Sequence, residues 1–90
     1  MEKDRFTTIK QTTLYFEGFE VQYLLLTSAG TPPSYSVYVY LISGEGYCLR
    51  EAFAQDITTL PQFAVEIFDA VTKGHVTPVT LHEIIEDIIA

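Results

Sequence analysis

Residues 59–90, TLPQFAVEIFDAVTKGHVTPVTLHEIIEDIIA, decide the fold, because they spell two amphipathic helices with start and stop signals. Thr59 and Gln62 have the spacing of a capping box, and Pro61 suits a first helical turn. Gly74 can take the left-handed conformation that ends a helix, so we expect the first helix over residues 59–73. Its apolar residues recur every three or four positions and form one stripe: Leu60, Phe63, Ala64, Ile67, Phe68 and Val71.

A second helix is expected over residues 77–90. It can begin at Thr77-Pro78 or at Thr80, and Thr80 with Glu83 again has capping-box spacing. The joint between the two helices is short, which favours an angled or antiparallel helix pair. The apolar stripe of this helix is aliphatic throughout: Leu81, Ile84, Ile85, Ile88 and Ile89.

The preceding residues, 7–57, have the composition of β-strands. Four segments, 7–16, 19–27, 35–43 and 47–57, are rich in Thr, Tyr, Phe and aliphatic residues, and turn-forming residues separate them. Strands followed by helices predict an α+β fold in one domain, residues 1–90, with two helices on one face of an antiparallel sheet of three to four strands.

The third strand is apolar on both faces, with Val37 and Val39 on one side and Tyr38 and Tyr40 on the other. Two helices cover only one side of a sheet, so we expect an apolar patch on the other side. Tyrosines that are half-exposed and solvated through their hydroxyls are the alternative. A patch of this kind favours self-association as a homodimer, and its expected interface residues are Tyr38, Tyr40, Ile42, Leu24 and Leu26.

Two segments of the chain resemble a known family. Asp56-Ile57-Thr58 and the later segment 76–88, VTPVTLHEIIEDI, are similar to a family of short uncharacterised bacterial proteins, the domain of unknown function numbered 6514. The sequence departs from the family pattern where Thr80 replaces a His and Glu83 replaces an Asp. The resemblance covers about the final third of the chain; it implies a domain of strands followed by helices and no known activity.

The charge and composition of the chain limit the classes of partner that it can bind. The 90 residues carry a net charge of −7, and residues 51–90 hold seven acids with Lys73 as their single base. Without a basic patch, we expect neither nucleic-acid binding nor attachment to an anionic membrane. A basic protein partner is compatible with this charge, although an acidic surface can equally serve only solubility.

Other features bear on the compartment. Residues 21–44 lack charge, but the polar segment 28–34 interrupts them, so we expect no membrane span. The polar start, residues 1–10, predicts no secretory signal, and the single Cys48 fits a reducing cytoplasm.

Candidate reactive residues are few. His82 and Glu86 lie one helical turn apart in an H-E-x-x-E string and are the weak candidates for a metal site; a solvated polar arc opposite the isoleucines is the better interpretation. Cys48 could act as a nucleophile with His75 or His82, but a half-buried strand cysteine is the favoured interpretation. We expect Asp56 to cap or hydrogen-bond near the start of the first helix, and we expect no cofactor.

Two classes of function stay open. The sequence favours a non-catalytic module for protein–protein interaction or self-association over an enzyme, since no catalytic constellation is visible. The alternative is a small ligand-binding or metal-dependent protein that uses the helix face carrying His82 and Glu86.

Overall fold

The computed structural model describes residues 6–89 of the chain. Four strands, β1 (Phe6–Phe16), β2 (Phe19–Ser28), β3 (Tyr35–Ser43) and β4 (Cys48–Thr58), precede two helices, α1 (Pro61–Lys73) and α2 (Leu81–Ile89). The expected domain over residues 1–90 therefore includes residues 1–5 and 90, which lie outside the described range.

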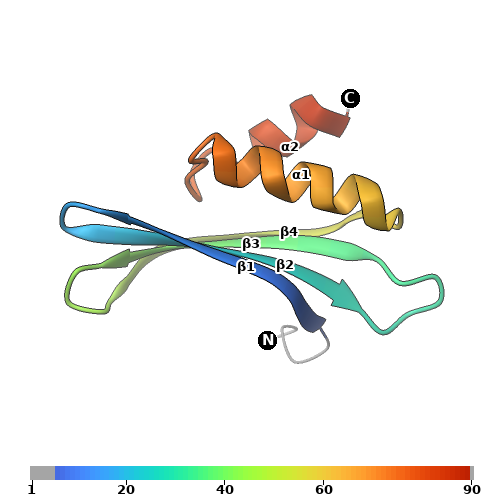
Figure 1. Cartoon of the computed structure of the whole chain (residues 1–90), viewed down its shortest axis with the longest axis horizontal. Helices are drawn as coiled ribbons and strands as arrows, with labels where there is room; N and C mark the ends of the chain where they lie inside the picture. The colour runs from blue at the N-terminus through green and yellow to red at the C-terminus, as the bar shows by residue number, and fades with distance from the viewer. Residues whose placement is uncertain (1–5, 90) are drawn as a thin grey trace.

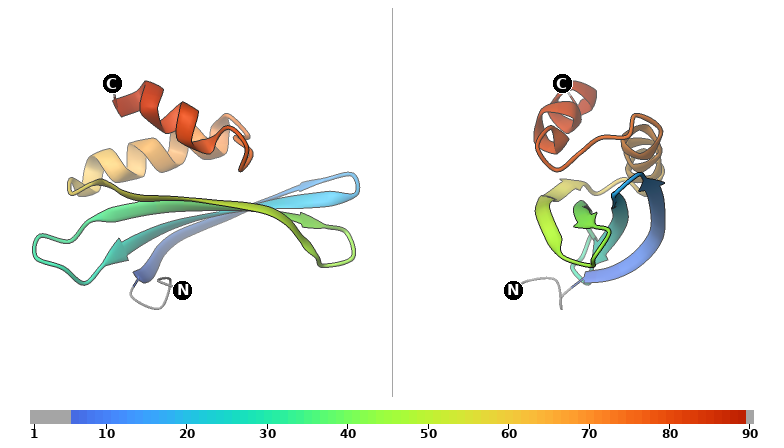
Figure 2. Two further views of the ribbon diagram at one scale, coloured as in Figure 1. Left: turned by 180° about the vertical axis from the view of Figure 1, so that it is seen from behind. Right: turned by 90° about the vertical axis from the view of Figure 1, so that its left-hand side faces the viewer.

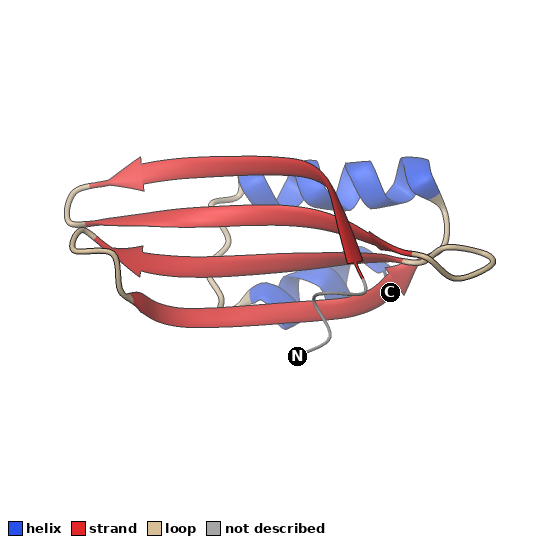
Figure 3. Ribbon diagram, turned by 90° about the horizontal axis from the view of Figure 1, so that it is seen from below, coloured by secondary structure: helices blue, strands red, loops and turns tan. Residues whose placement is uncertain are grey.

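The strands form one antiparallel sheet in the order β1-β2-β3-β4, so each strand pairs with its neighbour in the chain. Both helices lie on the same face of this sheet (Figure 1). Seen from the opposite side, the four strands are in front of the helices, and no described element covers them (Figure 3). This arrangement confirms the predicted α+β class, with four strands.

The core lies between the sheet and the two helices. Tyr23, Leu25, Val37 and Val39 on the central strands have no solvent exposure. Alternation places their side chains on one face, where α1 and α2 cover them. The helices contribute a matching apolar stripe, whose buried members are Ala64, Ile67, Phe68, Val71, Leu81 and Ile85.

Tyr23 ties the sheet to the joint between the helices. Its hydroxyl donates a hydrogen bond to the backbone carbonyl of Val76, over an oxygen–oxygen distance of 2.9 Å. Burial raises the pKa of the Tyr23 phenol above its ordinary value, because the charged phenolate is poorly solvated there. The buried polar tip therefore has a partner, which is the usual condition for burying a tyrosine.

The start of α1 differs from the expected capping box. The N-cap residue is Leu60, in an extended conformation with φ −95° and ψ 114°, and it makes no side-chain cap. Its N–H instead donates to Oγ1 of Thr58 at 3.1 Å. Since β4 continues to Thr58, the chain enters the helix later than expected, and the proposed pairing of Thr59 with Gln62 was wrong. Leu60 is 62% exposed and does not join the buried stripe.

The end of α1 also differs from the expectation that Gly74 would take the left-handed conformation. Gly74 has φ −80°, in the right-handed region, and His75 takes the left-handed conformation at φ 52°. A side chain at Gly74 would bring its Cβ within 3.1 Å of the Ala70 carbonyl oxygen, so close packing makes glycine suitable there. The second helix starts at Leu81, later than residue 77, which supports Thr80 as the better of the two expected starts.

Candidate functional site

The open face is the side of the sheet that faces away from the helices. Its apolar and aromatic residues are Phe6, Tyr15, Leu24, Leu26, Tyr38, Tyr40, Ile42 and Phe53, by alternation along the paired strands. The expectation that all five interface residues would be exposed was wrong for two of them, because Leu26 and Tyr38 are each only 3% exposed. Leu24, Tyr40 and Ile42 are partly buried.

Aromatic neighbours contribute to the burial of Tyr38. Its ring centroid lies 5.2 Å from that of Phe53 and 4.5 Å from that of Tyr40, and Phe6 packs edge-on against Phe53 at 5.4 Å. The sheet is also twisted and curved, as the end-on view shows (Figure 2). Rings on adjacent strands therefore cover one another, and the open face contains a small aromatic cluster of its own.

The two edge strands are irregular. The register of β1 against β2 shifts between Thr8 and Lys10, and that of β4 against β3 shifts near both of its ends. Arg50 and Glu51 add exposed charges near the start of β4. Bulges and charges of this kind protect sheet edges from pairing with another strand, so the open face is a better candidate for contact than either edge.

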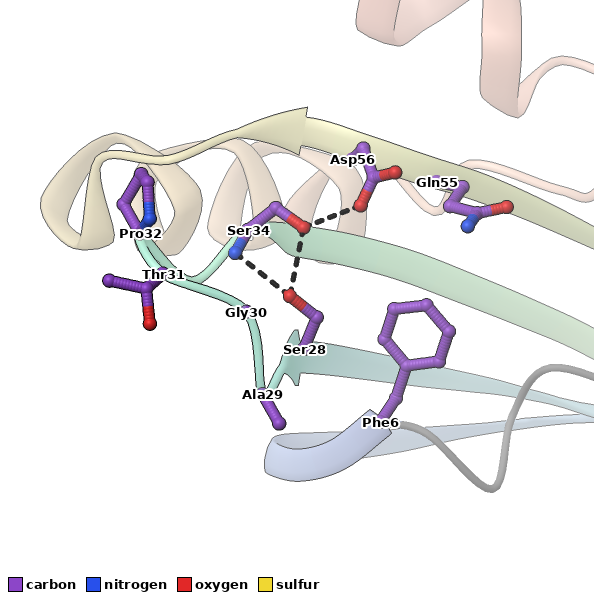
Figure 4. Close-up of a pocket in the computed structure, with 9 residues that line it drawn as sticks. All are labelled: Phe6, Ser28, Ala29, Gly30, Thr31, Pro32, Ser34, Gln55 and Asp56. Atoms are coloured by element: carbon purple, nitrogen blue, oxygen red, sulfur yellow. Dashed lines mark hydrogen bonds between the residues drawn. The ribbon is translucent and has the colours of Figure 1, made fainter.

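A cleft lies at one end of the sheet, between the β2–β3 loop, the start of β1 and the end of β4 (Figure 4). Its volume is about 650 Å³, which is in the usual range for small-molecule sites. We call it the loop cleft, and its described lining is Phe6, Ser28, Ala29, Gly30, Thr31, Pro32, Ser34, Gln55 and Asp56.

Hydrogen bonds organise the polar side of the loop cleft. The Ser34 hydroxyl donates to Oδ1 of Asp56, and the Ser34 N–H donates to Oγ of Ser28 at 3.1 Å. The Asp56 N–H in turn donates to Oγ of the buried Ser36 at 2.9 Å. Asp56 lies at the irregular end of β4, where its backbone takes the left-handed conformation with φ 55°. Asp56 was expected to cap or hydrogen-bond near the start of the first helix; it does not cap α1, and its hydrogen bonds go to Ser34 and Ser36 instead.

Sequence reasoning missed this cleft because its polar residues come from separate segments. Ser28 and Ser34 flank a loop, whereas Asp56 follows some twenty residues later. The available signal was the cluster of Ser, Thr, Gly and Pro in residues 28–34, which indicates a loop but not what the loop faces.

The other predicted residues are separate from the cleft. The expectation of a half-buried Cys48 was wrong, because the residue is exposed at the start of β4; its thiol donates to the Arg50 carbonyl at a sulfur–oxygen distance of 3.5 Å. His82 and Glu86 are both exposed on α2. Within residues 6–89, no three His, Cys, Asp or Glu side chains come together as a metal-binding group.

Comparison with protein-family models gives one match. The model of a family of unknown function, DUF6514, matches residues 5–90. The chain belongs to this family. The resemblance seen in the final third of the sequence thus extends over nearly the whole chain, including the strands that build the open face and the loop cleft. No curated protein and no solved structure matched the chain. Neither of the described helices has the length and apolar character needed to traverse a bilayer.

Proposed function

We propose that this family member is a non-catalytic interaction module that self-associates through the open face of its sheet. The observation that supports this proposal is that the sheet carries apolar residues on both faces, whereas the helices cover only one of them. Both helices pack on one face, while Leu24, Tyr40 and Ile42 on the other face keep part of their apolar surface in water. Removing that surface from water favours association.

The dimensions of the open face suit a second copy of the same chain. Strands of this length rise about 30–35 Å, and four of them span about 19 Å, so the projected face is roughly 600 Å². A stable interface buries about 800 Å² of accessible surface on each partner, and side-chain relief raises the accessible area above the projected one. Two open faces stacked together would form a β-sandwich with helices on its outer sides.

A basic protein is the alternative partner for the open face, because acidic residues lie on that face. Glu20 and Glu51 lie on the open face beside the apolar residues, and Gln22 donates a hydrogen bond to Glu20 at 2.8 Å. In a homodimer these carboxylates belong at the solvated rim, where water screens their repulsion. A basic protein would instead pair with them, which is an alternative outcome of the experiment below. The single exposed thiol of Cys48 supports a reducing location such as the cytoplasm.

The test is the molar mass in solution, measured by gel filtration with light scattering over a range of concentrations. We expect a dimer for the native chain and a monomer for Tyr40→Glu and Ile42→Glu, because each adds a charge to the proposed contact. Val65→Glu is the matched control, since Val65 is 37% exposed on α1, which lies on the other face of the sheet. Circular dichroism checks that each variant folds. A native chain that stays monomeric at millimolar concentration would refute self-association and leave a different protein as the occupant.

A further inference from the structure

We propose that the loop cleft binds a small organic cation, a protonated alkylamine, with Asp56 as its counter-ion and Phe6 as its apolar wall. The inference is independent of self-association, because it depends on the cleft at the end of the sheet. Three features of the cleft support it: a carboxylate that no cation among the described residues pairs with, a directed chain of hydroxyls, and an aromatic ring beside them (Figure 4).

The first feature is the charge of Asp56. Among the described residues, the ion pair that forms joins Lys10 to Asp69 on the other face of the sheet, and no Lys, Arg or His pairs with Asp56. The chain as a whole carries a net charge of −7, which favours cations over anions as ligands. Since no cation within residues 6–89 pairs with Asp56, a ligand can supply the positive charge.

The second feature is the direction of the hydroxyl chain. An ionised carboxylate only accepts hydrogen bonds, so the Ser34 hydroxyl must donate to Asp56. Its single proton is then used, and Ser28 must be the donor across the 3.1 Å contact between the two hydroxyl oxygens. Both serine protons therefore point toward the carboxylate. This end of the cleft offers acceptors, which suits a ligand with several N–H donors.

The third feature is the apolar part of the lining. The Phe6 ring, Ala29 and Pro32 border the same space as the carboxylate. An alkyl chain can lie against this surface while its ammonium group reaches Asp56, and a ring near an ammonium adds a cation–π attraction. A volume of about 650 Å³ exceeds what a bare metal ion needs and accommodates an alkylamine.

The experiment is an NMR titration of the full chain with n-butylammonium chloride, compared with 1-butanol as the neutral match in size. We expect saturable shifts of the amides of Ser34, Asp56 and Gly30 with butylammonium, and at least tenfold weaker binding of butanol. Nα-acetyl-lysine amide, in a parallel titration, distinguishes a free amine from a lysine side chain of a peptide. Binding of either one supports the proposal and identifies the source of the cation.

Asp56→Asn is the decisive variant, because asparagine keeps the shape and tolerates the left-handed conformation while losing the charge. We expect at least tenfold weaker binding, whereas Asp87→Asn, which removes an exposed charge on α2, should change the affinity less than twofold. If Asp56→Asn does not fold, Phe6→Leu keeps the carboxylate and should weaken butylammonium about threefold. Native affinity in the folded Asp56→Asn variant, shifts spread over the acidic surface, or tighter binding of Ca²⁺ than of butylammonium would each overturn the proposal.

Discussion

The two faces of the sheet carry similar residues and reach different degrees of burial. On the face toward the helices, Val37 and Val39 have no exposure, because α1 and α2 cover them. On the open face, Tyr38 between them is 3% exposed, although no described helix covers it. The neighbouring rings of Phe53 and Tyr40 contribute to this burial, although no described helix lies over the Tyr38 ring.

This difference teaches where an open apolar face stays available for contact. The centre of the open face is closed by Phe53 and Tyr40 against Tyr38, whereas Leu24 and Ile42 lie beside that cluster and remain partly exposed. Contact with a partner would therefore use the surroundings of the aromatic cluster more than its centre. Five predictions test how far the two faces differ in energy.

The largest effect is expected on the helical face. Phe68→Ala removes a ring with no exposure from the interface between α1 and the sheet, and we expect a loss of about 3–5 kcal/mol in the free energy of unfolding. Urea denaturation measures it. Val65→Ala on the outer side of α1, where the side chain is 37% exposed, should cost far less. Equal losses would mean that α1 does not bury the face described.

The second prediction concerns the open face. Tyr38→Ala should cost about 3 kcal/mol, near the lower limit for aromatic-to-alanine changes in cores, because the ring is buried among other rings. Tyr40→Ala should cost clearly less, since its side chain is partly exposed. Urea denaturation at low protein concentration, where association does not contribute, gives both values. A Tyr38 loss below 1 kcal/mol would contradict the burial of this face by its own rings.

The third prediction uses the hydrogen bond across the core. Tyr23→Phe removes the donor to the Val76 carbonyl and should cost about 1–3 kcal/mol. Because the folded pKa of Tyr23 is raised, the native state keeps its proton longer, and stability is lost as pH rises above the ordinary value of about 10. Tyr23→Phe should show a weaker decline over the same alkaline range. Parallel pH profiles for both proteins would contradict the assigned burial.

The fourth prediction concerns a contact at the margin of the helical face. Lys10 on β1 pairs with Asp69 on α1 at 3.1 Å, and both side chains are more than 40% exposed. Water screens such pairs, so Lys10→Gln should cost about 0.5 kcal/mol or less. Thermal unfolding at low and high salt measures the effect, and a difference that persists in high salt would indicate the contact of the Lys10 ammonium with the Phe68 ring, 5.8 Å from its centroid.

The smallest effect is expected on the outer side of α2, away from both faces of the sheet. His82→Ala combined with Glu86→Ala should leave the unfolding temperature unchanged, because both side chains are exposed. We also expect zinc to leave it unchanged. Zinc at a hundredfold excess over its dissociation constant would add about 2.7 kcal/mol, so a zinc-dependent rise that the double variant abolishes would establish the metal-binding alternative.

The sequence was sufficient for the elements whose signals are local. Four strands and two helices follow from alternation and from the three- and four-residue spacing of apolar residues, and the buried stripe of α1 contains four of the six residues expected. The ends of the helices were harder to predict from the sequence. Thr59 and Gln62 have the spacing of a capping box, but β4 extends to Thr58 and the capping box does not form.

The candidate sites could be predicted only in part. The composition of β3 indicates an apolar open face. It does not reveal that Tyr38 packs against Phe53, because register shifts in β4 hide from the sequence which residue of β4 lies opposite Tyr38. Tyr47 and Leu49 belong to the expected strand segment 47–57, yet both are exposed, and β4 begins only at Cys48. Ser34 and Asp56 meet through tertiary structure, so no spacing along the chain announces the loop cleft.

The order of the strands in the sheet also determines how the chain assembles. Because every strand pairs with its predecessor, each pairing closes a short loop, and such local topology favours rapid folding. During synthesis the four strands leave the ribosome before either helix, so the sheet can form while Val37 and Val39 are still uncovered. The time that α1 and α2 need to dock onto the sheet then sets how long this apolar face can associate with other chains. A nascent chain that ends before residue 61 contains all four strands but lacks the helices that cover their apolar face. We therefore regard the C-terminal helices as the part that protects the protein from aggregation.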